Sequence, residues 1–94
     1  MAITADATVN PIVVTGTTAA SNKIIDHQGF VKFIRWYKPT AVGHIVSITN
    51  QYGDRVTKEY CMQANLSVDI PVFSICDGLY CDDLDSGELY IYMQ

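Results

Sequence analysis

Apolar and polar residues alternate in short runs along most of the chain, and no long stretch keeps the period of an amphipathic helix. The runs are rich in Val, Ile, Thr, Tyr and Phe, which favour strands, and Gly, Pro, Asn and Asp separate them. This pattern predicts strands at residues 12–15, 23–26, 30–37, 44–50, 54–61, 66–74, 78–81 and 88–93. Short strands at regular spacing are typical of an antiparallel β-sandwich or small barrel, here of about seven strands. We therefore expect an all-β, single-domain fold.

The segment FVKFIRWY, residues 30–37, is the most informative of these strands. Side chains alternate between the two faces of a strand, which places Val31, Phe33, Arg35 and Tyr37 on one face and Lys32, Ile34 and Trp36 on the other. Large apolar groups on both faces predict a central strand, covered by a second sheet on one side and partly by neighbouring side chains on the other. Gly53, in the stretch NQYGD, can adopt the positive φ angle of a hairpin turn. We therefore expect residues 30–61 to form an antiparallel meander.

The first residues and two prolines suggest where the sheet has its edges. Residues 1–10 are small, polar and rich in Ala and Thr, which predicts a loose arm or an edge strand. Pro11 suits the start of the first strand, because proline cannot donate a hydrogen bond to a central ladder. Pro71 interrupts the run at residues 66–74, which should therefore lie at an edge or contain a bulge. The predicted organisation is an extended N-terminal arm at residues 1–10 and one domain at residues 11–94.

The length and net charge of the chain limit the number of domains and the kinds of partner that we expect. Ninety-four residues suit one domain, and ten acidic against six basic residues give a net charge of −4. Nucleic acid phosphates and anionic lipid headgroups repel a negative chain, so we expect neither nucleic acid nor membrane as a partner. The start MAITADATVN lacks the basic and apolar regions of a secretory signal, and no apolar run is long enough to cross a bilayer. We expect the chain to be retained in the cytoplasm or assembled there into something larger.

The cysteines Cys61, Cys76 and Cys81 are an odd number without a CxxC pair. Their spacing indicates neither a complete disulfide framework nor a zinc site. Buried thiols that behave as small apolar residues are the favoured interpretation. The alternatives are one disulfide between Cys76 and Cys81 or an intermolecular bridge.

The acidic run DDLDSG, which contains Asp82, Asp83 and Asp85, joins the last two predicted strands. Alternating carboxylates before a glycine could coordinate calcium, but the helix–loop–helix frame and the glutamate at the loop's twelfth position are missing. Asp and Gly are also common in turns, where Asp accepts hydrogen bonds from nearby amides. The favoured prediction is an acidic hairpin loop on the surface, with a weak cation site as the alternative. Acids gathered in an exposed turn face water rather than substrate, which disfavours paired-carboxylate catalysis.

Other catalytic patterns are weak. His27 and His44 lie near predicted strand ends, and nothing in their spacing supports a pairing with Cys61 as base and nucleophile. Glycine-rich phosphate loops and dinucleotide motifs are missing from the sequence. We therefore predict a protein that is not an enzyme and that uses no metal and no cofactor.

Aromatic residues are the main candidate contact groups, because their rings anchor protein contacts and stack on sugars. In the last strand, Tyr90 and Tyr92 share one face with Glu88, while Leu89, Ile91 and Met93 share the other. The tyrosine face is either the core of a second layer or a contact surface. The favoured prediction places Trp36 in the core, and the alternative places it on a contact surface. The candidate interface residues are Trp36, Tyr37, Tyr90 and Tyr92, with Ile3 from the arm and Pro11 from the start of the first strand.

Three segments follow one another within residues 30–94: the strand VKFIRWYKP, the strand GHIVSITN with the glycine turn after it, and the terminal element GLYCDDLDSGELYIYMQ. Their order resembles small structural proteins of tailed bacteriophages. In that family a KYIRW-like strand, a GH-opened strand and a terminal element of the form GLY…L.SG.LYIY recur. Cys81 stands where the pattern has an aliphatic residue, which keeps a role for its thiol open.

The resemblance implies a virion component: a decoration or cement protein on the capsid exterior, or a small part of the tail or of the head–tail junction. Such proteins act in repeated copies, often trimers, that bridge neighbouring major capsid subunits, and they are not enzymes. A homo-oligomer, a capsid-protein partner and a place in the virion are therefore expected. A carbohydrate- or receptor-binding sandwich that uses Trp36 or the tyrosines is the second hypothesis. A small enzyme or thiol-dependent protein is the third.

Overall fold

Seven β-strands make up the regular structure of this computed structural model, which describes residues 3–5, 10–18 and 22–94. The strands are β1 (Thr4–Ala5), β2 (Ile12–Thr15), β3 (Asn22–Tyr37), β4 (Ile45–Thr49), β5 (Arg55–Tyr60), β6 (Val68–Leu84) and β7 (Glu88–Met93). They pair antiparallel in one continuous sheet of order β1-β2-β7-β3-β6-β4-β5. Within the described residues there is no helix that could span a bilayer. The predicted all-β fold of about seven antiparallel strands is confirmed.

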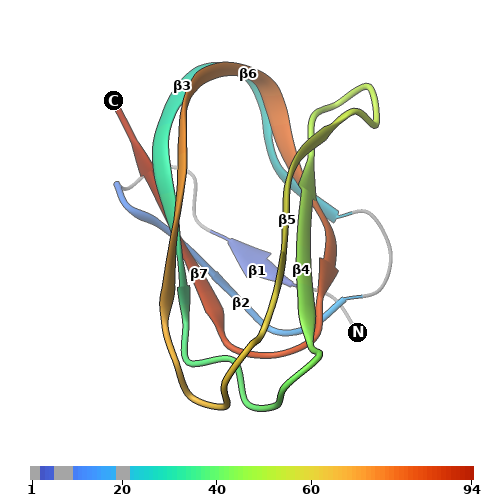
Figure 1. Cartoon of the computed structure of the whole chain (residues 1–94). Helices are drawn as coiled ribbons and strands as arrows, with labels where there is room; N and C mark the ends of the chain where they lie inside the picture. Colours follow the sequence, from blue (N-terminus) through green and yellow to red (C-terminus); the bar gives the residue numbers. More distant parts are fainter. Residues whose placement is uncertain (1–2, 6–9, 19–21) are drawn as a thin grey trace.

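Two long strands, β3 and β6, fold the sheet over on itself. They pair from Asn22 opposite Cys81 to Trp36 opposite Val68, and Figure 1 shows them arching together over one end of the molecule. Beyond the arch, β7, β2 and β1 extend the sheet from the second half of β3. On the other side, β4 and β5 extend it from the second half of β6. The two halves of the sheet therefore face each other as the layers of a sandwich.

Apolar side chains from both layers fill the space between them. One layer contributes Val14, Ile34, Trp36, Leu89 and Ile91, and the other contributes Val46, Ile48, Leu79, Cys81 and Leu84. Burying one such aliphatic side chain stabilises the fold by about 2 kcal/mol relative to leaving it exposed. The alternation predicted for the last strand is confirmed, because Leu89 and Ile91 are fully buried while Tyr90 and Tyr92 are only partly so.

Four of the predicted strands are parts of the two long ones: residues 23–26 and 30–37 belong to β3, and residues 68–74 of the predicted 66–74, with residues 78–81, belong to β6. The glycines that suggest turns, Gly29 and Gly78, lie in the arch instead. The strands stay paired there through irregular register, and Gln28 Nε2 donates a hydrogen bond to Asp77 Oδ1 at 3.1 Å. Gly78 relieves the bend with a φ of 83°. Pairing with a partner strand thus carries the chain through residues that would turn in isolation.

The predicted meander over residues 30–61 is wrong. The neighbours of β3 are β6 and β7, whereas β4 lies between β5 and β6. The segment after β3 crosses from one layer to the other, so β3 and β4 do not pair. Within residues 30–61, only the β4–β5 hairpin joins consecutive strands. Its turn is as predicted, with Gly53 at φ 86° and Asn50 Oδ1 accepting the amides of Tyr52 and Asp54.

A bulge in β3 changes the predicted faces of that strand. The register shifts between Val31 and Phe33, so Val31 points inward with Ile34 and Trp36, and Lys32 is exposed. The opposite strand is irregular at the same place, where Phe33 pairs with Pro71. The prediction of a bulge around Pro71 is therefore confirmed. The predictions that Val31 shares a face with Phe33, and that Lys32 shares one with Ile34 and Trp36, are wrong.

The described part of residues 1–10 includes an edge strand. Thr4 and Ala5 pair with Thr15 and Val14 of β2, and Ile3 packs against the core. Residues 1–2 and 6–9 of the predicted arm lie outside the described residues. At the end of this segment, the Asn10 side chain donates to the carbonyl of Met93 at 2.7 Å and accepts from its amide at 2.9 Å.

Candidate functional site: an exposed aromatic face

Large side chains gather on the outer side of the layer formed by β3, β6 and β7. Residues directly opposite one another on paired strands point to the same side of a sheet. The register places Phe33 between Pro71 and Tyr92, and Arg35 between Asp69 and Tyr90. We call this surface the outer face: Phe33, Arg35, Tyr37, Asp69, Pro71, Tyr90 and Tyr92.

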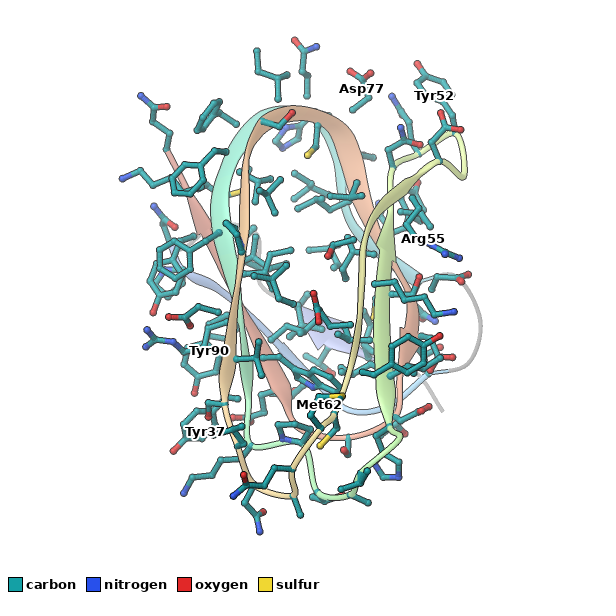
Figure 2. The ribbon with its side chains drawn as sticks, viewed as in Figure 1. Tyr37, Tyr52, Arg55, Met62, Asp77 and Tyr90 are labelled. Atoms are coloured by element: carbon teal, nitrogen blue, oxygen red, sulfur yellow. The ribbon has the colours of Figure 1, made fainter. Side chains whose placement is uncertain are left out.

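Two pairs of aromatic rings form the frame of the outer face. Phe33 and Tyr92 are stacked, with ring centroids 4.4 Å apart and an angle of 17° between the planes. Tyr37 and Tyr90 are tilted, with centroids 5.7 Å apart. Figure 2 shows Tyr37 and Tyr90 projecting from the same side of the molecule, away from the core. Lys38 Nζ lies 5.4 Å from the Tyr37 ring centroid, which adds a cation–π contact at the rim.

An ion pair lies between the two ring pairs. Arg35 Nε donates to Asp69 Oδ1 at 2.7 Å, and Arg35 Nη2 donates to Asp69 Oδ2 at 3.2 Å. These hydrogen bonds hold the pKa of Asp69 below its usual range and raise the pKa of Arg35. Both side chains are exposed, so the pair adds little to stability. Its effect is to fix a guanidinium in the middle of an aromatic surface.

Next to the outer face, the arch carries a second group of exposed apolar side chains. Phe73 is 64% exposed and Ile75 is 62% exposed, and Ile75 lies opposite Phe30 on β3. Phe73 has a φ of 48°, a left-handed conformation that bulky residues rarely adopt. We call Phe73, Ile75 and the half-buried Phe30 opposite Ile75 the crest. The left-handed conformation of Phe73 is energetically unfavourable, yet it leaves the ring exposed to water. Such strain in an exposed residue suggests that the ring contacts a binding partner.

Replacing Phe73 with asparagine should make the isolated protein more stable. Asparagine adopts the left-handed region more readily, so Phe73→Asn is expected to raise the free energy of unfolding by about 1 kcal/mol. Urea unfolding measures the change. The matched control is Ile75→Asn, at an equally exposed position whose φ is not positive, and it should give no gain. A destabilised Phe73→Asn would mean that the ring supports the fold itself.

The structure separates the interface candidates taken from the sequence. Tyr37, Tyr90 and Tyr92 lie on the outer face, which supports the contact-surface interpretation of the tyrosines over a second core layer. Trp36 is fully buried, so the core interpretation is correct and its side chain is not part of the exposed surface. Ile3 and Pro11 lie outside the outer face. Sequence reasoning missed the ion pair and the crest, because both depend on the pairing of β3 with β6.

The acidic run is not the loop predicted from the sequence. Asp82 and Asp83 belong to β6, and only residues 85–87 form the connection to β7. Asp85 Oδ2 accepts the amide of Ile45, 40 residues away at the start of β4, at 2.9 Å. No group of three or more potential metal ligands lies close enough within the described residues to hold an ion. Of the three aspartates, only Asp85 lies in the connection between the last two strands.

Ser86 ties three segments together beside this turn. Its carbonyl accepts Trp36 Nε1 at 2.8 Å, and its hydroxyl oxygen accepts the amide of Thr40 at 2.9 Å. The hydroxyl donates its proton to His44 Nδ1 at 2.7 Å when that nitrogen is unprotonated. A serine–histidine contact can also indicate a nucleophile and base. Here Ser86 is buried, and it ties the turn before β7 to β3 through its carbonyl and to the 38–44 connection through its hydroxyl.

All three cysteines, each within the described residues, are buried free thiols, as the favoured interpretation predicted. The alternative disulfide between Cys76 and Cys81 is not formed. Burial raises the pKa of Cys81 to about 12 and also raises the pKa of Cys76. A thiol must ionise to act as a nucleophile, so Cys81 serves the core as a small apolar residue.

A groove of about 310 Å³ lies between β5 and the first half of β6. Arg55 and Val56 line one side, and Pro71 and Val72 line the other. The two strand edges that flank the groove are poorly suited to bind a further strand. Pro71 has no amide hydrogen, and β5 has a register shift near Val56 and carries charged side chains. The outer face is therefore the better candidate for a contact surface.

No family model, curated protein or solved structure matches this chain. The functional argument consequently rests on the surface chemistry of the molecule. The features that carry it are the two aromatic pairs, the ion pair between them and the adjoining crest.

Proposed function

We propose that this protein is a non-enzymatic virion structural protein of a bacteriophage, a decoration or cement protein that binds the capsid exterior and bridges neighbouring major capsid subunits. The outer face is the surface that docks on the shell. The observation that carries the proposal is the ring frame around Arg35 and Asp69, continued by the crest. Tyrosine, arginine and phenylalanine are enriched in protein–protein interfaces relative to the rest of the protein surface, and the outer face combines all three.

The size of the exposed apolar surface supports a macromolecular partner. Single exposed apolar residues are common on monomers, but a row of them along one face marks an interaction site. The outer face and the crest together follow β3 and β6 from Tyr37 to the arch. Rigid strands hold these side chains in place, so little entropy is lost on binding. A repeated, flat capsid lattice is a partner that such a preformed surface can meet without rearrangement.

A binding module for carbohydrate is the second candidate. The observation that favours it is the Phe33–Tyr92 stack, because half-exposed rings on a rigid sheet can stack on a sugar ring. Binding to a glycan array that is lost in Tyr92→Ala and kept in Tyr52→Ala would support this candidate. Tyr52 is a suitable control because it is exposed in the β4–β5 turn, at the arch end of the molecule (Figure 2). If the protein binds no glycan on a broad array, the proposal of a protein contact is favoured over carbohydrate binding.

Quantitative mass spectrometry of purified virus particles tests the proposal directly. A decoration protein should be present at a constant ratio to the major capsid protein, and that ratio should survive repeated purification. A tail or head–tail component would appear in only a few copies per particle. Finding the chain only as free protein in infected cells, with none on particles, would rule out a virion role altogether.

A further inference from the structure

Two connections between strands form the end of the molecule opposite the arch (Figure 1). Residues 39–44 lead from β3 to β4, and residues 61–67 lead from β5 to β6. We call these two segments the tip. Figure 2 shows Met62 at this end of the molecule. The tip shares no residue with the outer face or the crest, so it is a separate surface.

Backbone hydrogen bonds join the two segments of the tip. The amide of Gly43 donates to the carbonyl of Cys61 at 2.9 Å, and the amide of Asn65 donates to the carbonyl of Pro39 at 2.7 Å. Asn65 has a φ of 64°, a left-handed conformation that asparagine adopts more readily than most residues. The tip is therefore a preformed surface, and a preformed surface loses little entropy when it binds.

The tip exposes apolar side chains and carries no formal charge. Met62 is 80% exposed, Val42 is 68% exposed and Leu66 is 46% exposed. The tip contains no aspartate, glutamate, lysine or arginine, although the chain has ten acidic and six basic residues. Its histidine, His44, is half-buried, with Nδ1 2.7 Å from the Ser86 hydroxyl oxygen. Apolar side chains grouped on the surface in this way mark an interaction site.

We propose that the tip is a contact between copies of this chain, in which the tips of neighbouring copies meet at a symmetry axis. Copies with a net charge of −4 repel one another, and a patch that meets its own counterpart brings like charges together. The tip avoids this repulsion because it has no charged side chain. The charged groups beside it have opposite signs: Lys38 precedes residues 39–44, and Asp85 accepts the amide of Ile45, which follows them.

The tip and the outer face differ as contacts with different partners should. The outer face has Arg35 and Asp69 at its centre, and such groups can be matched by charges on a foreign protein surface. The tip offers no charge for another protein to match, whereas a second uncharged tip complements it. The self-contact does not rest on the proposed capsid role, because copies of the chain can form it in solution without a shell.

Sedimentation equilibrium of the full chain in solution tests the self-contact. The tip is smaller than a standard interface, so we expect a dissociation constant of about 100 µM and a mean mass that rises above that of one chain. Met62→Asp combined with Leu66→Asp should weaken the association at least about tenfold, because the added charges repel across the axis. Trp36 emission checks that the variants are folded.

The matched control adds the same charge at exposed residues of the crest. Phe73→Asp combined with Ile75→Asp should weaken the association by less than about threefold, because these residues lie outside the tip. A chain that stays monomeric up to about 1 mM, or equal weakening by the two double variants, would overturn the proposal.

Disulfide trapping locates the contact directly. Identical residues close to a symmetry axis approach one another, so Met62→Cys should form an intermolecular disulfide under mild oxidation. The natural cysteines are buried and do not compete. Ile75→Cys, also at an exposed position, is the control and should cross-link more slowly. Cross-linking of Met62→Cys no faster than that of Ile75→Cys would contradict the self-contact, whereas binding to virus particles, measured separately, tests the capsid role.

Discussion

Gly87→Ala is expected to lower the free energy of unfolding by about 3 kcal/mol, a large part of the total stability of a domain of this size. Gly87 has a φ of 77°, and a Cβ atom there would lie 2.6 Å from the carbonyl oxygen of Tyr37 and 3.0 Å from Trp36 Nε1. The first contact is with backbone, which cannot rotate away. The second would disturb the hydrogen bond from Trp36 to Ser86. The melting temperature should fall by more than about 10 °C.

The control for this variant is Gly53→Ala. Gly53 has a similar φ of 86°, but a Cβ atom there would meet nothing within 4 Å. Gly53→Ala therefore carries the backbone cost alone, about 1 kcal/mol. Thermal unfolding followed by circular dichroism measures both variants. If the two variants lost the same free energy of unfolding, the packing around the β6–β7 turn would be looser than the structure shows.

Trp36→Ala is expected to cost about 4 kcal/mol, the range for removing a fully buried tryptophan. The side chain is at the centre of the sandwich and has no exposed area. Its loss leaves a cavity between the layers and removes the donor to the buried Ser86 carbonyl. Trp36→Phe keeps most of the apolar volume and loses the hydrogen bond, so its cost should be about half as large.

The adjacent residue provides the matched control for these two variants. Tyr37→Ala removes an aromatic ring from the outer face, and its cost should stay near 1 kcal/mol because the ring is partly exposed. Trp36 is the only tryptophan, so Trp36 variants must be followed by circular dichroism rather than by intrinsic tryptophan emission. If Trp36→Ala cost no more than Tyr37→Ala, Trp36 would belong to the surface, as the second interpretation of the sequence held.

Local patterns in the sequence predict some parts of this fold well. The alternation at residues 12–15 and 88–93 and the NQYGD turn each depend on residues close in the chain, and each is found in the structure. The arch is different. Gly29 and Gly78 look like turn residues, but Gly29 is paired with Cys76, and Gly78 lies at a register shift within β6 from which pairing resumes on both sides. Strand length is therefore decided by the partner, which a single sequence does not reveal.

The candidate surface was predictable only in part, for the same reason. Alternation puts Phe33, Arg35 and Tyr37 together, and Tyr90 with Tyr92, because each set lies on one strand. Nothing local indicates that these two strands are neighbours, or that Asp69 faces Arg35. The bulge that turns Val31 inward also has its cause in pairing. The acidic run was assigned to a loop because Asp is rare in strands, whereas Asp83 is held in β6 by its pairing with Ser47.

The most direct test of the outer face is the binding of the purified chain to virus particles produced without it. Tyr37→Ser combined with Tyr92→Ser removes two rings of the face, and Tyr52→Ser combined with Tyr60→Ser removes two exposed rings elsewhere. Trp36 emission checks that both double variants are folded. We predict that the first binds at least about tenfold more weakly than the natural chain, and that the second binds within about twofold of it. Equal binding by the two double variants would contradict the assignment of the outer face as the contact surface.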